Sequence, residues 1–271
     1  PVAGMQVHVR DEGPRDDPLP IVLLHGTSDS LHTWEGWASQ LRSQRRVIRF
    51  DLPGFGLTGP NATGDYSIDA YVQFVAAVLD QLGAPRVVLG GNSLGGEIAW
   101  RVALAMPQRV ARLILVDAAG YPMVPEEVPL GFVLAHTAGL RTAMEYLLPR
   151  GLMLSSMRSV YGDPSRVTPE LVDRYYDMAL RAGNRRALGQ RLALISQDDR
   201  SDRIRTLTLP TLVLWGAQDR LIPVAFARRF AQDIAGASLV VLEGLGHLPQ
   251  QEDPMRSVAA VQQFLGQGPQ K

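Results

Sequence analysis

The sequence predicts an α/β protein with a mostly parallel sheet, helices on both faces of the sheet and an inserted helical cap. Short, wholly apolar runs alternate with helical patterns, as expected for buried strands joined by crossover helices. The alternation is interrupted once, by a long segment with helical spacing and no strand pattern. The chain has 271 residues, of which 46% are hydrophobic, which is enough for one large core with an insertion.

Six apolar runs are the expected strands of the parallel sheet, because strands covered on both faces need apolar side chains throughout. They are IVLLHG (21–26), RVIRFD (46–51), RVVLGGN (86–92), RLILVD (112–117), TLVLWG (211–216) and SLVVLEG (238–244). An earlier segment, MQVHVRDEG (5–13), alternates apolar and polar residues instead. That alternation predicts an antiparallel strand at the edge of the sheet.

Helical spacing of apolar residues predicts five helices that connect and cover these strands. They lie at 34–42, 69–82, 93–106, 223–234 and 254–266. From Tyr121 to about Arg205, leucine, methionine, proline and tyrosine mix with arginine at helical spacing. We therefore expect a core made of residues 1–120 and 206–271, with residues 121–205 inserted as a helical cap, or lid.

Charge and composition restrict the class of partner. Lys+Arg and Asp+Glu both number 27, so no net charge favours nucleic acid or an anionic membrane. No apolar run reaches the length that a membrane span needs. We expect a small-molecule substrate, no nucleic acid and no membrane contact by the chain as given, and the sequence leaves the oligomeric state open.

The cellular location is only weakly restricted. The absence of cysteine excludes disulfides and thiolate metal sites, and it fits cytoplasm and periplasm alike. The sequence starts at Pro1 rather than at a methionine. Cytoplasm is the expected location, and a segment ahead of Pro1 would make the periplasm or a membrane anchor the alternative.

A single serine lies where a predicted strand changes directly into a predicted helix, in VVLGGNSLGGEIAW (87–100). A G-x-S-x-G turn forces Ser93 into strained, usually positive-φ backbone, and a Cβ at Gly91 or Gly95 would collide with neighbouring backbone. The strain projects the hydroxyl into open space, with the amide of Leu94 at the helix N-terminus. An ordinary tight turn is the alternative, but the strand-to-helix setting favours a nucleophile.

A serine nucleophile needs a base, and His247 is the expected one. It lies in the glycine-flanked loop GLGHLPQQEDP, after the last predicted strand. Three other histidines are less well placed: His8 in the edge strand, His32 beyond the HG turn and His136 in the cap. His25 is expected to brace its own turn.

The base needs a carboxylate that holds its tautomer and stabilises the imidazolium, and Asp219 is the first candidate. It lies three residues past a predicted strand, in LVLWGAQDRLIPV. Asp117 ends its own strand and is the rival candidate, because geometry rather than chain order defines this role. Asp51, in DLPGFG, comes early in the chain and is expected to fix a turn.

The oxyanion that forms when a serine attacks a carbonyl needs two hydrogen-bond donors. One is the amide of Leu94, and the other is expected from the loop after the 21–26 strand, with Thr27 as the first choice and Ser28 as the second. No histidine or carboxylate cluster with metal-ligand spacing and no dinucleotide fingerprint occurs. The sequence therefore implies neither a metal nor a cofactor.

These motifs together resemble the α/β-hydrolase fold superfamily over essentially the whole chain. The matching segments are LLHGTSDSLHTW, RVIRFDLPGFGLTGP, GNSLGGEIAW, LWGAQDRLIP and GLGHLPQQEDP. The resemblance implies the serine hydrolase branch, because Ser93 stands where the similar haloalkane dehalogenases and epoxide hydrolases carry aspartate. GNSLGG is also similar to the carbon–carbon hydrolases of aromatic-ring degradation. Those typically carry tryptophan after the catalytic histidine, where this chain has Leu248.

We therefore predict a carboxylesterase-type serine hydrolase that cleaves small to medium apolar esters through an acyl-enzyme. The alternatives are carbon–carbon bond hydrolysis of a ring-cleavage product, acyl transfer to an alcohol or peroxide, and ligand binding without turnover. Apolar side chains are expected to roof Ser93 and bind the substrate, since pockets have mostly apolar walls. They are Phe132, Met144, Tyr146, Met153 and Leu248. Packing of cap against cap is the alternative role for each cap residue.

Overall fold

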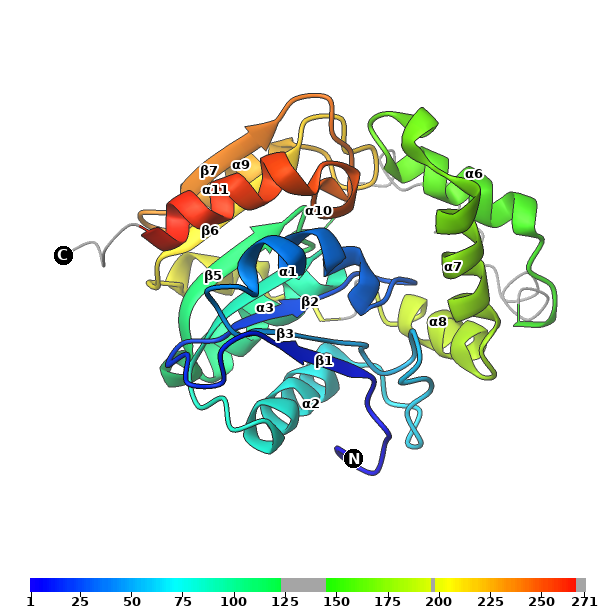
Figure 1. The fold of residues 1–271 in the computed structure, drawn as a ribbon, viewed down its shortest axis with the longest axis horizontal. Helices are drawn as coiled ribbons and strands as arrows, with labels where there is room; N and C mark the ends of the chain where they lie inside the picture. The colour runs from blue at the N-terminus through cyan, green and yellow to red at the C-terminus, as the bar shows by residue number, and fades with distance from the viewer. Residues whose placement is uncertain (123–144, 196–197, 267–271) are drawn as a thin grey trace.

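The computed structural model describes residues 1–122, 145–195 and 198–266, and its core is a sheet with helices on both faces (Figure 1). The strands are β1 (Val9–Glu12), β2 (Ile21–Leu24), β3 (Val47–Phe50), β4 (Val87–Asn92), β5 (Val110–Val116), β6 (Thr211–Gly216) and β7 (Ser238–Leu242). Their order is β1-β3-β2-β4-β5-β6-β7. Only β1 pairs antiparallel among these strands, so the predicted α/β class and its antiparallel edge strand are confirmed.

Helices bury both faces of this sheet, which explains the unbroken apolar runs. The α-helices are α1 (Glu35–Leu41), α2 (Ile68–Gln81), α3 (Leu94–Ala105), α6 (Arg150–Val160), α7 (Pro169–Leu180), α8 (Asn184–Leu192), α9 (Ala225–Asp233), α10 (Pro249–Glu252) and α11 (Pro254–Gly266). In β2, Ile21 and Leu23 pack with α1 and α11. The alternate residues Val22 and Leu24 pack with α2, α3 and α9 on the other face.

The edge strand is shorter than predicted. β1 covers only Val9–Glu12 of the expected 5–13 segment. Val2 and Met5 pair with each other in an isolated bridge, so the chain turns before it reaches the sheet. A local pairing of this kind replaces the longer ladder that alternation alone predicts.

The segment between β5 and β6 holds α6, α7 and α8, which lie to one side of the sheet in Figure 1. Three-residue and longer 3₁₀ turns complete the described elements: η1 (Leu31–Trp34), η2 (Pro107–Arg109), η4 (Pro164–Arg166) and η5 (Ser201–Thr206). Residues 145–195 and 198–205 contain helices and turns and no strand. Of the helices that the structure describes, none is long and apolar enough to cross a membrane.

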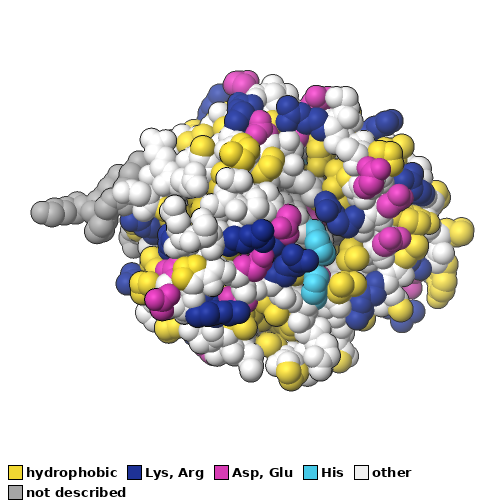
Figure 2. Space-filling model, in the orientation of Figure 1, with side chains coloured by type: hydrophobic (Ala, Val, Ile, Leu, Met, Phe, Trp, Pro, Cys, Tyr) yellow, Lys and Arg dark blue, Asp and Glu magenta, His cyan; other side chains and the backbone are white. Residues whose placement is uncertain are grey.

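Charges of both signs are interspersed on the face of the molecule that Figure 2 shows. Several arginines form ion pairs near β1. The buried Arg49 guanidinium lies 2.6 Å from a Glu12 oxygen and 2.7 Å from a Glu35 oxygen. Arg46 pairs with Asp11 at 2.9 Å. This paired arrangement gives the visible face no field of a single sign.

Candidate active site

Ser93 lies at a sharp turn between β4 and α3. Its backbone has φ 54° and ψ −119°, a conformation that residues other than glycine rarely adopt. A Cβ on Gly91 would overlap the Gly95 carbonyl, and a Cβ on Gly95 would overlap the Leu24 carbonyl. The Ser93 amide donates to the Val116 carbonyl at 3.1 Å, which fixes the turn against β5. The sequence therefore requires glycine at both flanking positions, and the strain turns the serine away from regular structure.

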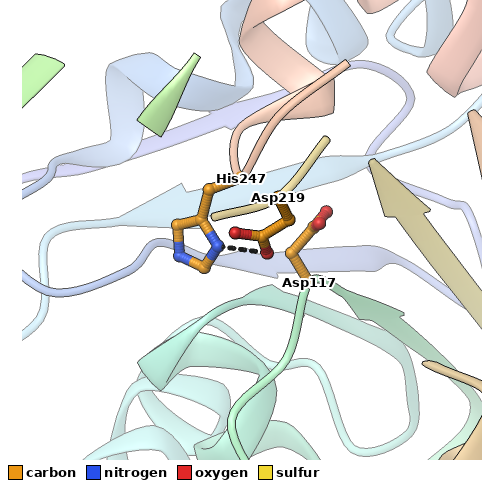
Figure 3. A group of neighbouring side chains, drawn as sticks. All are labelled: Asp117, Asp219 and His247. Carbon is orange, nitrogen blue, oxygen red and sulfur yellow. Dashed lines mark hydrogen bonds and ion pairs between the residues drawn. The ribbon is translucent and has the colours of Figure 1, made fainter. Parts of the chain in front are cut away.

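The structure brings His247 and Asp219 together from two loops at the carboxyl ends of neighbouring strands (Figure 3). The His247 Nδ1 atom lies 2.7 Å from Asp219 Oδ2, and both side chains are buried. The other carboxylate oxygen accepts the amides of Leu221 at 2.8 Å and Ile222 at 3.0 Å. With Nδ1 donating to the carboxylate, Nε2 keeps the lone pair that a general base needs.

Asp117 packs beside this pair without taking its place. It is fully buried, and its Oδ1 atom accepts the Gly216 amide at 3.0 Å. Burial, and next the adjacent charge of Asp219, raise the pKa of the Asp117 carboxyl well above its usual range. Of the two candidate acids, Asp219 is the one hydrogen-bonded to His247.

The same three side chains also have spacing that could suit a metal ion. Atoms of Asp117, Asp219 and His247 lie within 4.8 Å of one another. His247 and Asp219, however, are already joined by a hydrogen bond that uses the His247 Nδ1 proton. A cation at this point would have to displace that proton, so an acid–base pair accounts for the geometry better than a metal centre does.

Asn92 anchors the loop that carries the histidine. Its Nδ2 atom donates to the His247 carbonyl at 3.0 Å and to the Val116 carbonyl at 3.1 Å. The side chain therefore ties the serine turn, β5 and the histidine loop together. Sequence reasoning missed this role, although Asn92 stands directly before the serine in GNSLGG.

The loop after β2 lies against the serine turn. A Cβ built on Gly26 would lie 3.1 Å from the Ser93 Cβ atom, so the backbone that continues into Thr27 and Ser28 passes beside the nucleophile. Ser28 has a positive φ of 60°. Leu94 is the first residue of α3, where amides have no partner within the helix. Both predicted oxyanion donors are thus in the neighbourhood of Ser93, and their role stays a prediction.

His25 and Asp51 hold the neighbouring turns, as their positions in the sequence indicate. His25 Nε2 accepts the Leu52 amide at 2.9 Å. The Asp51 carboxylate accepts the amides of Leu31 and Leu57, each at 2.7 Å. Both side chains are therefore occupied by backbone contacts, away from the His247–Asp219 pair.

A cavity lies between the loops that follow β2 and β3 and the helices α6, α7 and α8. Its wall is mostly apolar and includes Met153 of α6, whereas Ser93 and His247 are not among the residues that line it. The substrate-binding role of Met153 stays a prediction. The polar wall residues are Ser28 and Asp29 from the loop after β2, and Asn184 and Arg185 from α8. Burial raises the pKa of the Asp29 carboxyl. The cavity thus opens beside the loop expected to supply an oxyanion donor.

The other predicted substrate contacts are distributed differently. Tyr146 is 72% exposed and is not part of the cavity wall, because its side chain projects into solvent. Leu248 is 6% exposed and packs with Met157 and Tyr161, in and just after α6, rather than on the cavity. The predicted contacts Phe132 and Met144 lie outside the described residues.

This arrangement suits attack on a carbonyl carbon. A strained serine at a helix N-terminus, a buried imidazole with its Nδ1 proton held by a carboxylate, and nearby backbone amides are the components of acyl transfer through a serine.

Comparison with known proteins agrees with the geometry. A family model for the alpha/beta hydrolase fold matches residues 20–254. A 2-hydroxymuconate semialdehyde hydrolase from Pseudomonas putida is 32% identical, over 98% of this chain and 92% of the relative.

Two solved structures are similar over nearly their whole length. A meta-cleavage product hydrolase from Pseudomonas fluorescens IP01 has a TM-score of 0.84 at 27% identity, covering 97% of this chain and 95% of that one. A thermophilic esterase from Thermogutta terrifontis has a TM-score of 0.81 at 28% identity, covering 96% and 93%. The chain therefore belongs to the alpha/beta hydrolase fold family.

Proposed function

We propose that this hydrolase cleaves a carbon–carbon bond beside a carbonyl group in an aromatic ring-cleavage product. Ser93 adds to the carbonyl carbon, and His247 takes the hydroxyl proton while Asp219 holds the imidazole. The amides of Thr27 and Leu94 bind the oxyanion. The leaving carbon departs with the electron pair of the broken bond and takes up a proton. Water then releases the acyl group from Ser93.

The observation that carries the proposal is similarity over the full length to a hydrolase of this substrate class. The 32% identity to the Pseudomonas putida 2-hydroxymuconate semialdehyde hydrolase extends over 98% of this chain, cap segment included. A second relative, 31% identical over 97% of this chain, is a 2-hydroxy-6-oxo-2,4-heptadienoate hydrolase. The alignment spans residues 121–205 as well, and this part of the chain supplies much of the cavity wall.

The cavity contains a cation that suits a substrate of this kind, since a muconate or dienoate carries a carboxylate. Arg185 lies on the wall, and its guanidinium donates to the backbone carbonyls of Glu145 at 2.7 Å and Ala179 at 3.4 Å. Both partners are uncharged, and no ion pair of Arg185 occurs among the described residues. Among the described residues no carboxylate pairs with this guanidinium, which suits recognition of a substrate carboxylate.

Ester hydrolysis is the second candidate, and it was the main prediction from the sequence. Leu248 occupies the position after His247, where carbon–carbon hydrolases typically carry tryptophan. The similarity to the Thermogutta terrifontis esterase also supports this candidate. Both reactions use the same serine and base, so the substrate distinguishes them.

A paired substrate assay tests the proposal. We expect a higher kcat/KM for 2-hydroxy-6-oxo-2,4-heptadienoate than for any member of a series of neutral p-nitrophenyl esters. Arg185→Ala should lower kcat/KM for the dienoate by about 10- to 100-fold, since a hydrogen bond to a charged group contributes about 1.5–3 kcal/mol. Activity on the neutral esters should change little.

Arg186→Ala is the matched control, because the neighbouring Arg186 is exposed, pairs with Glu145 and is not part of the cavity wall. A preference for the esters in the wild-type protein would favour the carboxylesterase instead. Equal losses for both substrate classes in Arg185→Ala would show that Arg185 does not bind the carboxylate.

A further inference from the structure

A buried carboxylate joins the cap to the loop that carries the histidine. Glu252, at the end of α10, is 6% exposed. Its Oε2 atom accepts the amides of Gly162 at 2.9 Å and Gly246 at 3.2 Å, and its Oε1 atom accepts the amide of Asp163 at 3.2 Å. Gly246 directly precedes His247, whereas Gly162 and Asp163 follow the cap helix α6. One side chain thus binds both segments.

The two segments also contact each other directly. The His247 amide donates to the carbonyl of Val160, the last residue of α6, at 2.7 Å. A Cβ on Gly162 would lie 2.8 Å from the Gly246 nitrogen, and a Cβ on Gly246 would overlap the Val160 carbonyl. The backbones therefore meet with no side chain between them. Any shift of the end of α6 presses on the residues that hold the base.

The histidine loop needs such support because its own sequence gives little stiffness. Gly244 has a positive φ of 82°, and Gly246 adds a second flexible position directly before His247. Asn92 holds the loop at the His247 carbonyl. On the amide side, Glu252 and the Val160 carbonyl supply the contacts.

We propose that Glu252 is a positioning residue for His247, and that it makes the placement of this base depend on the seating of cap helix α6 on the core. The proposal rests on the proposed role of His247 as the base. Glu252 does not touch the reacting atoms. It acts by fixing the backbone on either side of the junction, so that a correctly seated cap and a correctly placed imidazole occur together.

The expected effect follows from the cost of misplacing a catalytic group. Glu252→Ala removes the acceptor from three amides and leaves the histidine loop free to shift. A displacement of about 1 Å can reduce the rate about 100-fold. We expect kcat to fall by about that factor, with little change in KM, because the cavity wall is untouched. Glu252→Gln keeps one oxygen that can accept the Gly162 and Gly246 amides, so we expect roughly a tenfold loss.

Tyr161→Phe is the matched control at the same junction. The Tyr161 hydroxyl donates to Gln251 Oε1 at 2.9 Å, so its loss weakens the contact between cap and core but leaves the amides of the histidine loop bound. We expect its kcat to stay within about twofold of the wild-type value. Thermal unfolding of all three variants shows how much each change destabilises the fold.

A spectroscopic readout makes the test independent of the substrate. The His247 Nδ1 proton, shared with Asp219, should give a far-downfield proton NMR signal in the wild type and in Tyr161→Phe, and a broadened or shifted one in Glu252→Ala. A Glu252→Ala protein with the wild-type signal and kcat would overturn the proposal. If that variant does not fold, Glu252→Gln decides: a kcat and signal equal to those of Tyr161→Phe would overturn it. Failure of the proposed reaction would appear separately, as absent dienoate turnover with the NMR differences intact.

Discussion

Ser93→Ala is expected to fold normally and to lose hydrolysis by several powers of ten, of the order of a millionfold where a triad nucleophile is removed. Only the hydroxyl group is lost. The strained turn is held by backbone contacts and by Gly91 and Gly95, which the substitution leaves unchanged. The large factor arises because the remaining groups have nothing to activate. The measurement is kcat for the dienoate and for a p-nitrophenyl ester, with circular dichroism to show that the variant is folded. A folded variant with turnover near that of the wild type would contradict the whole mechanism.

Asp219→Asn should reduce kcat by about 10⁴-fold, because an amide in place of the carboxylate no longer holds the Nδ1 proton of His247. Asp117→Asn should cost less than about tenfold, because burial and the Asp219 charge already favour an uncharged side chain there. The two variants carry the same chemical change, aspartate to asparagine, at neighbouring sites. Each is therefore a control for the other. A larger loss in Asp117→Asn would move the triad acid to the end of β5.

The Asp117→Asn variant also has an expected pH signature. A raised folded-state pKa means that the folded protein binds a proton which the unfolded chain releases above about pH 4. The contribution of Asp117 to the free energy of unfolding is therefore progressively lost as pH rises above that value. Asparagine does not ionise, so its contribution does not change with pH. The melting temperature of Asp117→Asn minus that of the wild type should therefore increase between about pH 4 and pH 8. A difference that is constant with pH would show that Asp117 titrates normally.

Local sequence was sufficient for the parts of the site that depend on local geometry. The glycine pattern around Ser93 predicts a strained turn because the clashes involve backbone only a few residues or one strand away. Asp219 and His247 each follow a predicted strand, and ligands of such sheets bind beyond the carboxyl ends of the strands. The structure joins them through a 2.7 Å contact.

The long-range supports of the site could not be predicted in this way. Asn92 contacts the His247 carbonyl across 155 residues of sequence, and Glu252 binds Gly162 across 90. Nothing in the type or spacing of these residues distinguishes them from solvated polar side chains. The segment expected to form the cap could be predicted only in part as well. Apolar spacing predicts helices, but it does not predict which side chains face the cavity: Met153 lines it, while Tyr146 faces solvent.

Predicting the substrate class also needed long-range geometry that the sequence does not reveal. Apolar cap residues favoured neutral esters, whereas the cavity also contains Arg185 with uncharged partners. An arginine in an arginine-rich segment gives no sequence signal of its own, because the neighbouring Arg186 is exposed and pairs with the partly buried Glu145 carboxylate instead. Similarity over the full length to ring-cleavage hydrolases is what favours an anionic substrate.

Covalent labelling with a fluorophosphonate tests the central claim most directly, since the reagent reacts with a serine only where a base activates it. Intact-mass and peptide mass spectrometry of the treated protein should show one adduct per chain, located on Ser93. Ser93→Ala should take up no label, and Asp219→Asn should react far more slowly than Asp117→Asn. Absence of an adduct in the folded wild-type protein, or an adduct on another serine, would contradict the assignment of Ser93 as a nucleophile activated by His247 and Asp219.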